Sequence, residues 1–153
     1  MIEIGRSKRA ATVYGFDDIA IVPTRRTRTP GDVSLSWTID ALTFDFPLLA
    51  APMDSVMSPA TAIAFGKLGG LGVLNLEGLW TRYEDPEPLL AELAELHDPI
   101  AATKRMQRIY AEPVKAELIG ARLREIRDAG VPVAGSLSPQ RVRRIWLFVL
   151  AIT

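Results

Sequence analysis

Three short apolar runs interrupt a chain that is otherwise amphipathic from residue 47 onward. Each run carries few polar residues, which is typical of strands buried on both faces of a parallel sheet. Between the first two runs, Ser58-Pro59 forms an N-cap followed by a proline at the first helical position, and Gly69-Gly70 ends the helix. This order predicts a parallel strand–helix–strand unit. The expected strands are residues 47–53, 70–75 and 131–137.

Amphipathic segments surround these runs. Apolar residues recur at helical spacing after Ser58-Pro59, Asp85-Pro86, Asp98-Pro99 and Glu112-Pro113. Residues 33–37 and 42–46 alternate apolar and polar side chains with period two, which predicts a half-exposed hairpin. The acidic stretch 84–98 is interpreted as a solvated helix face, because no converging metal ligands accompany it. The expected helices are residues 59–68, 86–96, 100–110 and 114–129.

The pattern divides the chain into three parts. Residues 1–46 form an arm and a hairpin, residues 47–140 form the α/β part with a helical segment at 84–129, and residues 141–153 form an atypical apolar tail. The apolar run of the tail is too short to cross a bilayer, which takes about 20 residues. The tail is either a truncated or frame-shifted end, or a strand that closes a smaller domain.

Composition excludes several classes of function. The 153 residues are 48% hydrophobic with a net charge of +0, which indicates a soluble globular protein without general attraction for nucleic acid or a membrane. The chain has no cysteine, so disulfides, thiolate metal sites and a cysteine nucleophile are excluded. A signal-peptide core is missing from the start, and cytoplasm is the default location. His97 and the basic loop at 24–32 are interpreted as a helix-end cap and a solvated turn, with catalysis and phosphate contact as the respective alternatives.

Polar residues gather where the predicted strands end. Met53-Asp54-Ser55 follows the first strand, and Asn75 and Glu77 follow the second. Folds of the α/β class place their chemistry at the carboxyl ends of parallel strands. Asp54 and Ser55 could equally serve only to cap the loop.

Three further segments stand in order along the chain: Tyr14-Gly-Phe-Asp-Asp-Ile-Ala-Ile-Val-Pro23, Leu49-Ala-Ala-Pro-Met-Asp-Ser-Val56 and Gly69-Gly-Leu-Gly-Val-Leu74. This series resembles the N-terminal third of the IMP dehydrogenase / GMP reductase family, most closely its short bacterial IMP dehydrogenase-related branch. The resemblance covers about residues 12 to 140 and implies a (β/α)8 barrel, which takes about 250 residues. The chain supplies about three of its eight strands, so we expect a partial barrel with an N-terminal hairpin. The resemblance also implies that a helical insert stands where longer members carry a paired CBS regulatory domain.

The resemblance also implies a function. The IMP dehydrogenases of this family oxidise IMP to XMP with NAD as cofactor, and full-length family members are homo-oligomers. By position, Ala51, Met53, Asp54 and Ser55 correspond to the substrate-binding segment, where Ser55 replaces the usual threonine. Asn75 occupies a cofactor-binding position at which many members have histidine. No catalytic residue and no metal ligand are assigned.

The family's catalytic cysteine loop, phosphate loops and Arg-Tyr flap all follow the third strand, and none is present in this sequence. The chain alone is therefore expected to be inactive and prone to association through open sheet edges, and deleting residues 142–153 should improve its solubility. A GMP reductase-like enzyme and a non-catalytic barrel fragment or interaction protein remain alternatives. The enzyme is favoured for the ancestry of the chain, and the non-catalytic fragment for the 153-residue product by itself.

Overall fold

The computed structural model describes residues 2–3, 9–22 and 29–142, so the predictions for the tail and for most of the basic loop lie outside the described residues. The chain separates into two compact units, Met1–Ser34 and Leu35–Thr153. In the first unit, β1 (Ile2–Glu3) pairs antiparallel with β2 (Arg9–Ala10), and two 3-10 turns follow, η1 (Phe16–Asp18) and η2 (Pro30–Asp32). The division at residues 46 and 140 remains a prediction.

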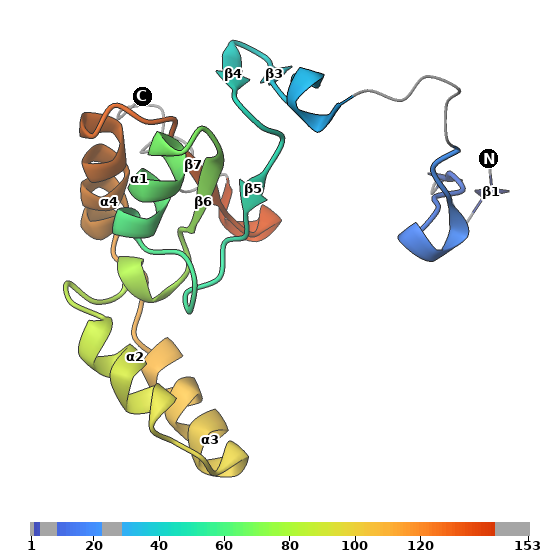
Figure 1. Ribbon diagram of the computed structural model, residues 1–153. Helices are drawn as coiled ribbons and strands as arrows, with labels where there is room; N and C mark the ends of the chain where they lie inside the picture. The colour runs from blue at the N-terminus through green and yellow to red at the C-terminus, as the bar shows by residue number, and fades with distance from the viewer. Residues whose placement is uncertain (1, 4–8, 23–28, 143–153) are drawn as a thin grey trace. The chain divides into compact units, whose positions relative to one another are not determined.

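The second unit contains the parallel sheet that the apolar runs predict (Figure 1). Its strand order is β5-β6-β7, and both pairings are parallel, which confirms the α/β class. The strands are β5 (Leu49–Ala50), β6 (Leu71–Asn75) and β7 (Ala134–Ser136).

The first strand is shorter and less buried than expected. The backbone turns directly after β5: the N–H of Met53 donates to the Ala51 carbonyl at 2.8 Å, and the N–H of Met57 donates to the Met53 carbonyl at 2.7 Å. Leu48 and Leu49 are 54% and 53% exposed, because β5 is the outer strand of the described sheet and its apolar side chains lack a neighbour on that side. The expectation of full burial was therefore wrong for this strand.

The helices lie close to their predicted positions. They are α1 (Pro59–Lys67), α2 (Glu87–Ala94), α3 (Pro99–Tyr110) and α4 (Ala116–Asp128), with a 3-10 turn η3 (Leu79–Thr81) after β6. In α1 the Ser58 hydroxyl accepts from the Thr61 N–H at 3.0 Å, while the Thr61 hydroxyl oxygen accepts from the Ser58 N–H at 2.6 Å. This reciprocal cap fixes the start of α1. Gly69, with φ +96°, adopts the left-handed conformation just beyond its end.

The hairpin forms further along the chain than the alternation suggested. Its strands are β3 (Trp37–Ile39) and β4 (Leu42–Phe44), and Trp37 pairs with Phe44. Residues 33–36 are not strand: the 3-10 turn η2 ends at Asp32, and β3 begins only at Trp37. The turn places Asp40 at φ 51°, which an aspartate tolerates better than most side chains.

Helices α1 and α4 lie side by side against the sheet, and their shared interface holds the core (Figure 1). Close packing of α1 on β6 depends on Gly72, where an added Cβ would lie 2.7 Å from the Ala62 Cα. Because of this close approach, α1 packs directly on β6 and covers that face of the sheet. The core cluster consists of Met57, Ala62, Leu74, Leu76, Ile119, Leu123 and Ile126.

Candidate functional site

The loops that follow β5, β6 and β7 meet at the carboxyl edge of the sheet. The register pairs Ala50 with Gly72 and Asn75 with Ser136, so the three strands end on the same side. Two side chains then connect the loops: Asp54 reaches from the first loop to the second, and Glu77 reaches from the second to the third. The sequence therefore predicted the correct edge of the sheet for the polar side chains.

Asp54 points into the protein. Its Oδ2 accepts a hydrogen bond from the Leu79 N–H at 3.1 Å and another from the Tyr110 hydroxyl. Its Oδ1 is buried, packs against Gly78, and has no hydrogen-bond partner among the described residues. Both oxygens are thus occupied by protein or enclosed by it, so the side chain joins two loops.

The neighbours of Asp54 in sequence point the other way. Met53 is 55% exposed, and Ala51 and Ser55 are also exposed. In this tight turn the Asp54 side chain faces the protein, and the side chains on either side of it, Met53 and Ser55, face solvent. The loop therefore exposes the Met53 thioether and the Ser55 hydroxyl, while the Asp54 carboxylate binds the loop to the Leu79 N–H.

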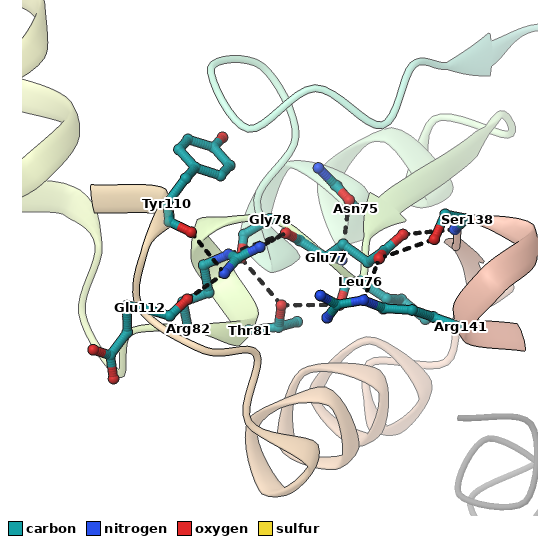
Figure 2. Close-up of polar contacts among 10 residues, drawn as sticks. All are labelled: Asn75, Leu76, Glu77, Gly78, Thr81, Arg82, Tyr110, Glu112, Ser138 and Arg141. Atoms are coloured by element: carbon teal, nitrogen blue, oxygen red, sulfur yellow. Dashed lines mark hydrogen bonds and ion pairs between the residues drawn. The ribbon is translucent and has the colours of Figure 1, made fainter. Parts of the chain in front are cut away.

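Asn75 is half-buried at the last position of β6. Its side-chain oxygen accepts from the Glu77 N–H at 3.0 Å, which closes a local turn (Figure 2). This use of the amide oxygen is typical of asparagine at strand ends. The structure brings Asn75 to the same edge as Met53 and Ser55, but commits its oxygen to the backbone.

Glu77 holds the loop after β7. Its carboxylate accepts from the Ser138 N–H at 2.6 Å and from the Ser138 hydroxyl at 3.1 Å, and it forms an ion pair with the Arg141 Nε at 2.9 Å (Figure 2). Burial raises the pKa of Glu77, but the two Ser138 hydrogen bonds and the charges of Arg141 and Arg82 outweigh it, so the pKa lies below its ordinary value. Glu77 is therefore a charged cap on the turn that begins at Ser138.

Arg82 connects the loop after β6 to the segment between α3 and α4. Its Nε and Nη2 donate to the Glu77 carbonyl at 3.2 and 3.0 Å, and its Nη1 donates to the carbonyls of Tyr110, at 3.1 Å, and Glu112 (Figure 2). The guanidinium also lies 5.4 Å from the centre of the Tyr110 ring. Sequence reasoning missed both Arg82 and Tyr110, because their contacts join distant segments and leave no local motif.

Tyr110 is a neutral hydrogen-bond donor over a wide pH range. Burial raises the pKa of its hydroxyl, the hydrogen bond to Asp54 and the charge of that carboxylate raise it further, and Arg82 opposes them in part. The hydroxyl therefore keeps its proton well above the ordinary tyrosine range, and it can donate to Asp54 at any physiological pH.

Two arginines at the strand ends, Arg82 and Arg141, are both engaged by protein oxygens. Among the described residues, no group of three or more His, Cys, Asp or Glu side chains could hold a metal ion. His97 lies in the exposed connection between α2 and α3. Within the described ranges, no helix is long and apolar enough to span a membrane.

Known proteins match both the sequence and the fold. Residues 13–80 match the IMP dehydrogenase / GMP reductase domain. An uncharacterized oxidoreductase of Mycolicibacterium smegmatis is 43% identical over 149 residues, covering 95% of this chain and 40% of the relative. Another from Mycobacterium tuberculosis is 44% identical over 151 residues, covering 96% of this chain and 40% of the relative. The chain thus spans about 40% of the length of these curated relatives.

A solved structure extends the match to the whole chain. The crystal structure of an IMP dehydrogenase/GMP reductase-like protein from Corynebacterium glutamicum superposes with a TM-score of 0.83 at 42% identity, covering 99% of this chain and 42% of that one. Both the sequence segments and the parallel sheet fit this comparison, and a partial barrel explains the observed sheet. Over residues 13–80 the chain matches the IMP dehydrogenase / GMP reductase domain, and over 99% of its length it resembles a solved IMP dehydrogenase/GMP reductase-like protein.

Proposed function

We propose that this chain supplies the base-binding end of a purine-nucleotide site, in a protein whose full reaction is the NAD-dependent oxidation of IMP to XMP. One observation carries the proposal: Met53 and Ser55 are exposed on the loop after β5, and the inward-pointing Asp54 anchors that loop. The polarizable thioether of Met53 suits the face of a purine ring, and the Ser55 hydroxyl can pair with a polar edge.

The phosphate end of a nucleotide fits the described residues poorly. Phosphate recognition takes cations or free backbone N–H groups, and Arg82 and Arg141 are held by carbonyl and carboxylate oxygens. Asn75 likewise commits its side-chain oxygen to the Glu77 N–H. NAD is therefore assigned by resemblance to the family alone, and we derive no hydride-transfer step from these residues.

The absence of cysteine from the sequence limits the chemistry of the 153-residue chain. A covalent step on the purine requires an activated nucleophile. The Met53 thioether carries no proton that a base could remove, and among the described residues no base forms a hydrogen bond with the Ser55 hydroxyl. We therefore propose that the chain alone binds IMP weakly, with a dissociation constant in the millimolar range, about −4 kcal/mol, and does not oxidise it. The engaged arginines also favour the second candidate, a non-catalytic barrel fragment, over a GMP reductase-like enzyme.

The Met53→Ala variant tests the site. Met53 is mostly exposed, so truncation should weaken IMP binding severalfold while the melting temperature changes little. Chemical-shift titration of the full chain with IMP measures binding, and circular dichroism measures melting. Met106→Ala is the matched control, because Met106 is a 44% exposed methionine on α3.

Two results would contradict the proposal. If saturating IMP shifts the signals of other residues and leaves 51–55 and 75–77 unchanged, the site lies elsewhere. If Met53→Ala lowers the melting temperature strongly, Met53 is a packing residue.

The purified chain should not oxidise IMP. NADH formation from IMP and NAD, measured against a no-protein control, should stay at background. Turnover that survives removal of host enzymes would refute the prediction that the chain is inactive.

A further inference from the structure

The α2–α3 part of the chain contacts the loop after β5 through the side chain of Tyr110. Tyr110, the last residue of α3, donates its hydroxyl proton to the Asp54 carboxylate. Asp54 is the residue that anchors the Met53 and Ser55 surface to the loop after β6. Tyr110 of the α2–α3 insert therefore contacts the inward-facing residue, Asp54, of the proposed base-binding loop.

The Tyr110 end of this contact is held by two further side chains. The Arg82 guanidinium binds the backbone carbonyls of Tyr110 and Glu112, which fixes the end of α3 against the loop after β6. The Tyr83 hydroxyl donates to the carbonyl of the buried Ile109 at 2.9 Å, one residue before Tyr110. The ring of Tyr110 thus has little freedom to follow Asp54 if the loop moves.

The insert itself is braced as a hairpin. Arg105 on α3 forms a two-pronged ion pair with Glu92 on α2, with Nε–Oε1 and Nη2–Oε2 distances of 2.6 and 2.7 Å. Bidentate pairs of this kind restrict relative rotation of the helices that carry them. A displacement of α2 and α3 would therefore reach Asp54 through Tyr110.

We propose that Tyr110 is a positioning residue that couples the α2–α3 insert to the Met53–Ser55 loop through Asp54. This inference rests on the proposed function for its effect on nucleotide binding, while the coupling itself rests on geometry. The α2–α3 insert then sets the position of the Met53 thioether at the carboxyl ends of the strands. It does so without contacting the ligand.

The test compares Tyr110→Phe with Tyr14→Phe in the full chain. Each variant removes one tyrosine hydroxyl, but Tyr110 donates to Asp54 whereas Tyr14 is 70% exposed. We expect Tyr110→Phe to raise the dissociation constant for IMP about tenfold, because a charge-assisted hydrogen bond that orders the loop is lost. The amide signals of Ser55 and Leu79 should shift at the same time, whereas Tyr14→Phe should leave both the signals and the affinity near those of the wild type.

A second variant, Asp54→Asn, tests the same contact from its other side in case Tyr110→Phe disturbs folding. Asp54→Asn removes the charge with little change in shape, and the double variant Asp54→Asn/Tyr110→Phe should weaken binding no more than the stronger single change. Additive losses, or a Tyr110→Phe variant with wild-type affinity and unchanged Ser55 signals, would overturn the coupling. If wild-type protein fails to bind IMP, the proposed function fails, and the Ser55 and Leu79 signals in Tyr110→Phe still decide whether the coupling exists.

Discussion

At the residue scale, the contact between Gly78 and Asp54 decides how the site is built. A Cβ at position 78 would lie 1.9 Å from the Asp54 Oδ1, so only glycine leaves room for the carboxylate in its inward position. The same carboxylate caps the Leu79 N–H, which belongs to η3. Glycine here serves close approach, and the loop after β5 can dock on the loop after β6 only because this side chain is absent.

The Gly78→Ala variant should therefore be destabilised. The methyl group must displace the Asp54 carboxylate and break its bond to Leu79, which should lower the free energy of unfolding by about 2–3 kcal/mol. Urea denaturation followed by circular dichroism measures the change. Gly31→Ala is the control, because nothing lies within 4 Å of a Cβ built at Gly31. Equal stability of the two variants would show that the carboxylate is not packed as described.

At the scale of elements, Glu77 joins β6 to the turn after β7. Its carboxylate satisfies the Ser138 N–H and pairs with Arg141, which lies one turn further on. An anionic group beside the first N–H groups of a helical turn is stabilising, and here it comes from a neighbouring strand. The parallel pairing of β6 and β7 is thus supported at its carboxyl end by a side-chain contact.

The Glu77→Gln variant should show a pH-dependent loss of stability. Because the pKa of Glu77 is lowered from 4.5 in the folded chain, its contribution is fully present above pH 4.5 and is lost as the pH falls through the lowered value. We expect the variant to be about 1–2 kcal/mol less stable near neutral pH and to match the wild type more closely in acid.

Urea denaturation on both sides of pH 4.5 measures this difference. Glu95→Gln, which makes the same chemical change at the exposed end of α2, should show a much smaller effect. A stability gap between Glu77→Gln and wild type that stays constant from neutral to acidic pH would contradict the assigned ion pair.

At the scale of the whole molecule, the described sheet has an open side at β5. Leu48, Leu49 and Val56 are more than half exposed in this region, next to the exposed Met53. An outer strand with apolar side chains offers unpaired backbone groups and a hydrophobic surface to another chain. The prediction that the chain associates in solution therefore has a specific location on the molecule.

The Leu49→Lys variant should reduce this association. A charge on an outer strand opposes edge-to-edge pairing, so the average mass in light scattering after gel filtration should fall toward that of the monomer. Ile100→Lys is the control, since Ile100 is 66% exposed and lies on α3. A wild-type chain that is already monomeric, or equal effects of both variants, would contradict association through β5.

The sequence by itself determined the class of fold and the edge of the sheet that carries the polar residues. Apolar runs, the Ser58-Pro59 cap and the Gly69-Gly70 stop are local signals, and each element they predict has a counterpart in the structure. Three sequence segments in family order also predicted a resemblance to IMP dehydrogenase / GMP reductase proteins, which the comparisons confirm. Local signals suffice here, because helix capping and helix termination act through neighbouring residues.

Only the tertiary structure decided what the polar residues do. Sequence position made Asp54 a candidate ligand contact, whereas its neighbours in space, Leu79 and Tyr110, make it an anchor between loops. Arg82 carried no signal at all, since the carbonyls it binds belong to residues as distant as Tyr110 and Glu112. A hydrogen bond depends on the direction of a donor and an acceptor after folding, and that direction is set by packing between segments that the order of residues keeps far apart.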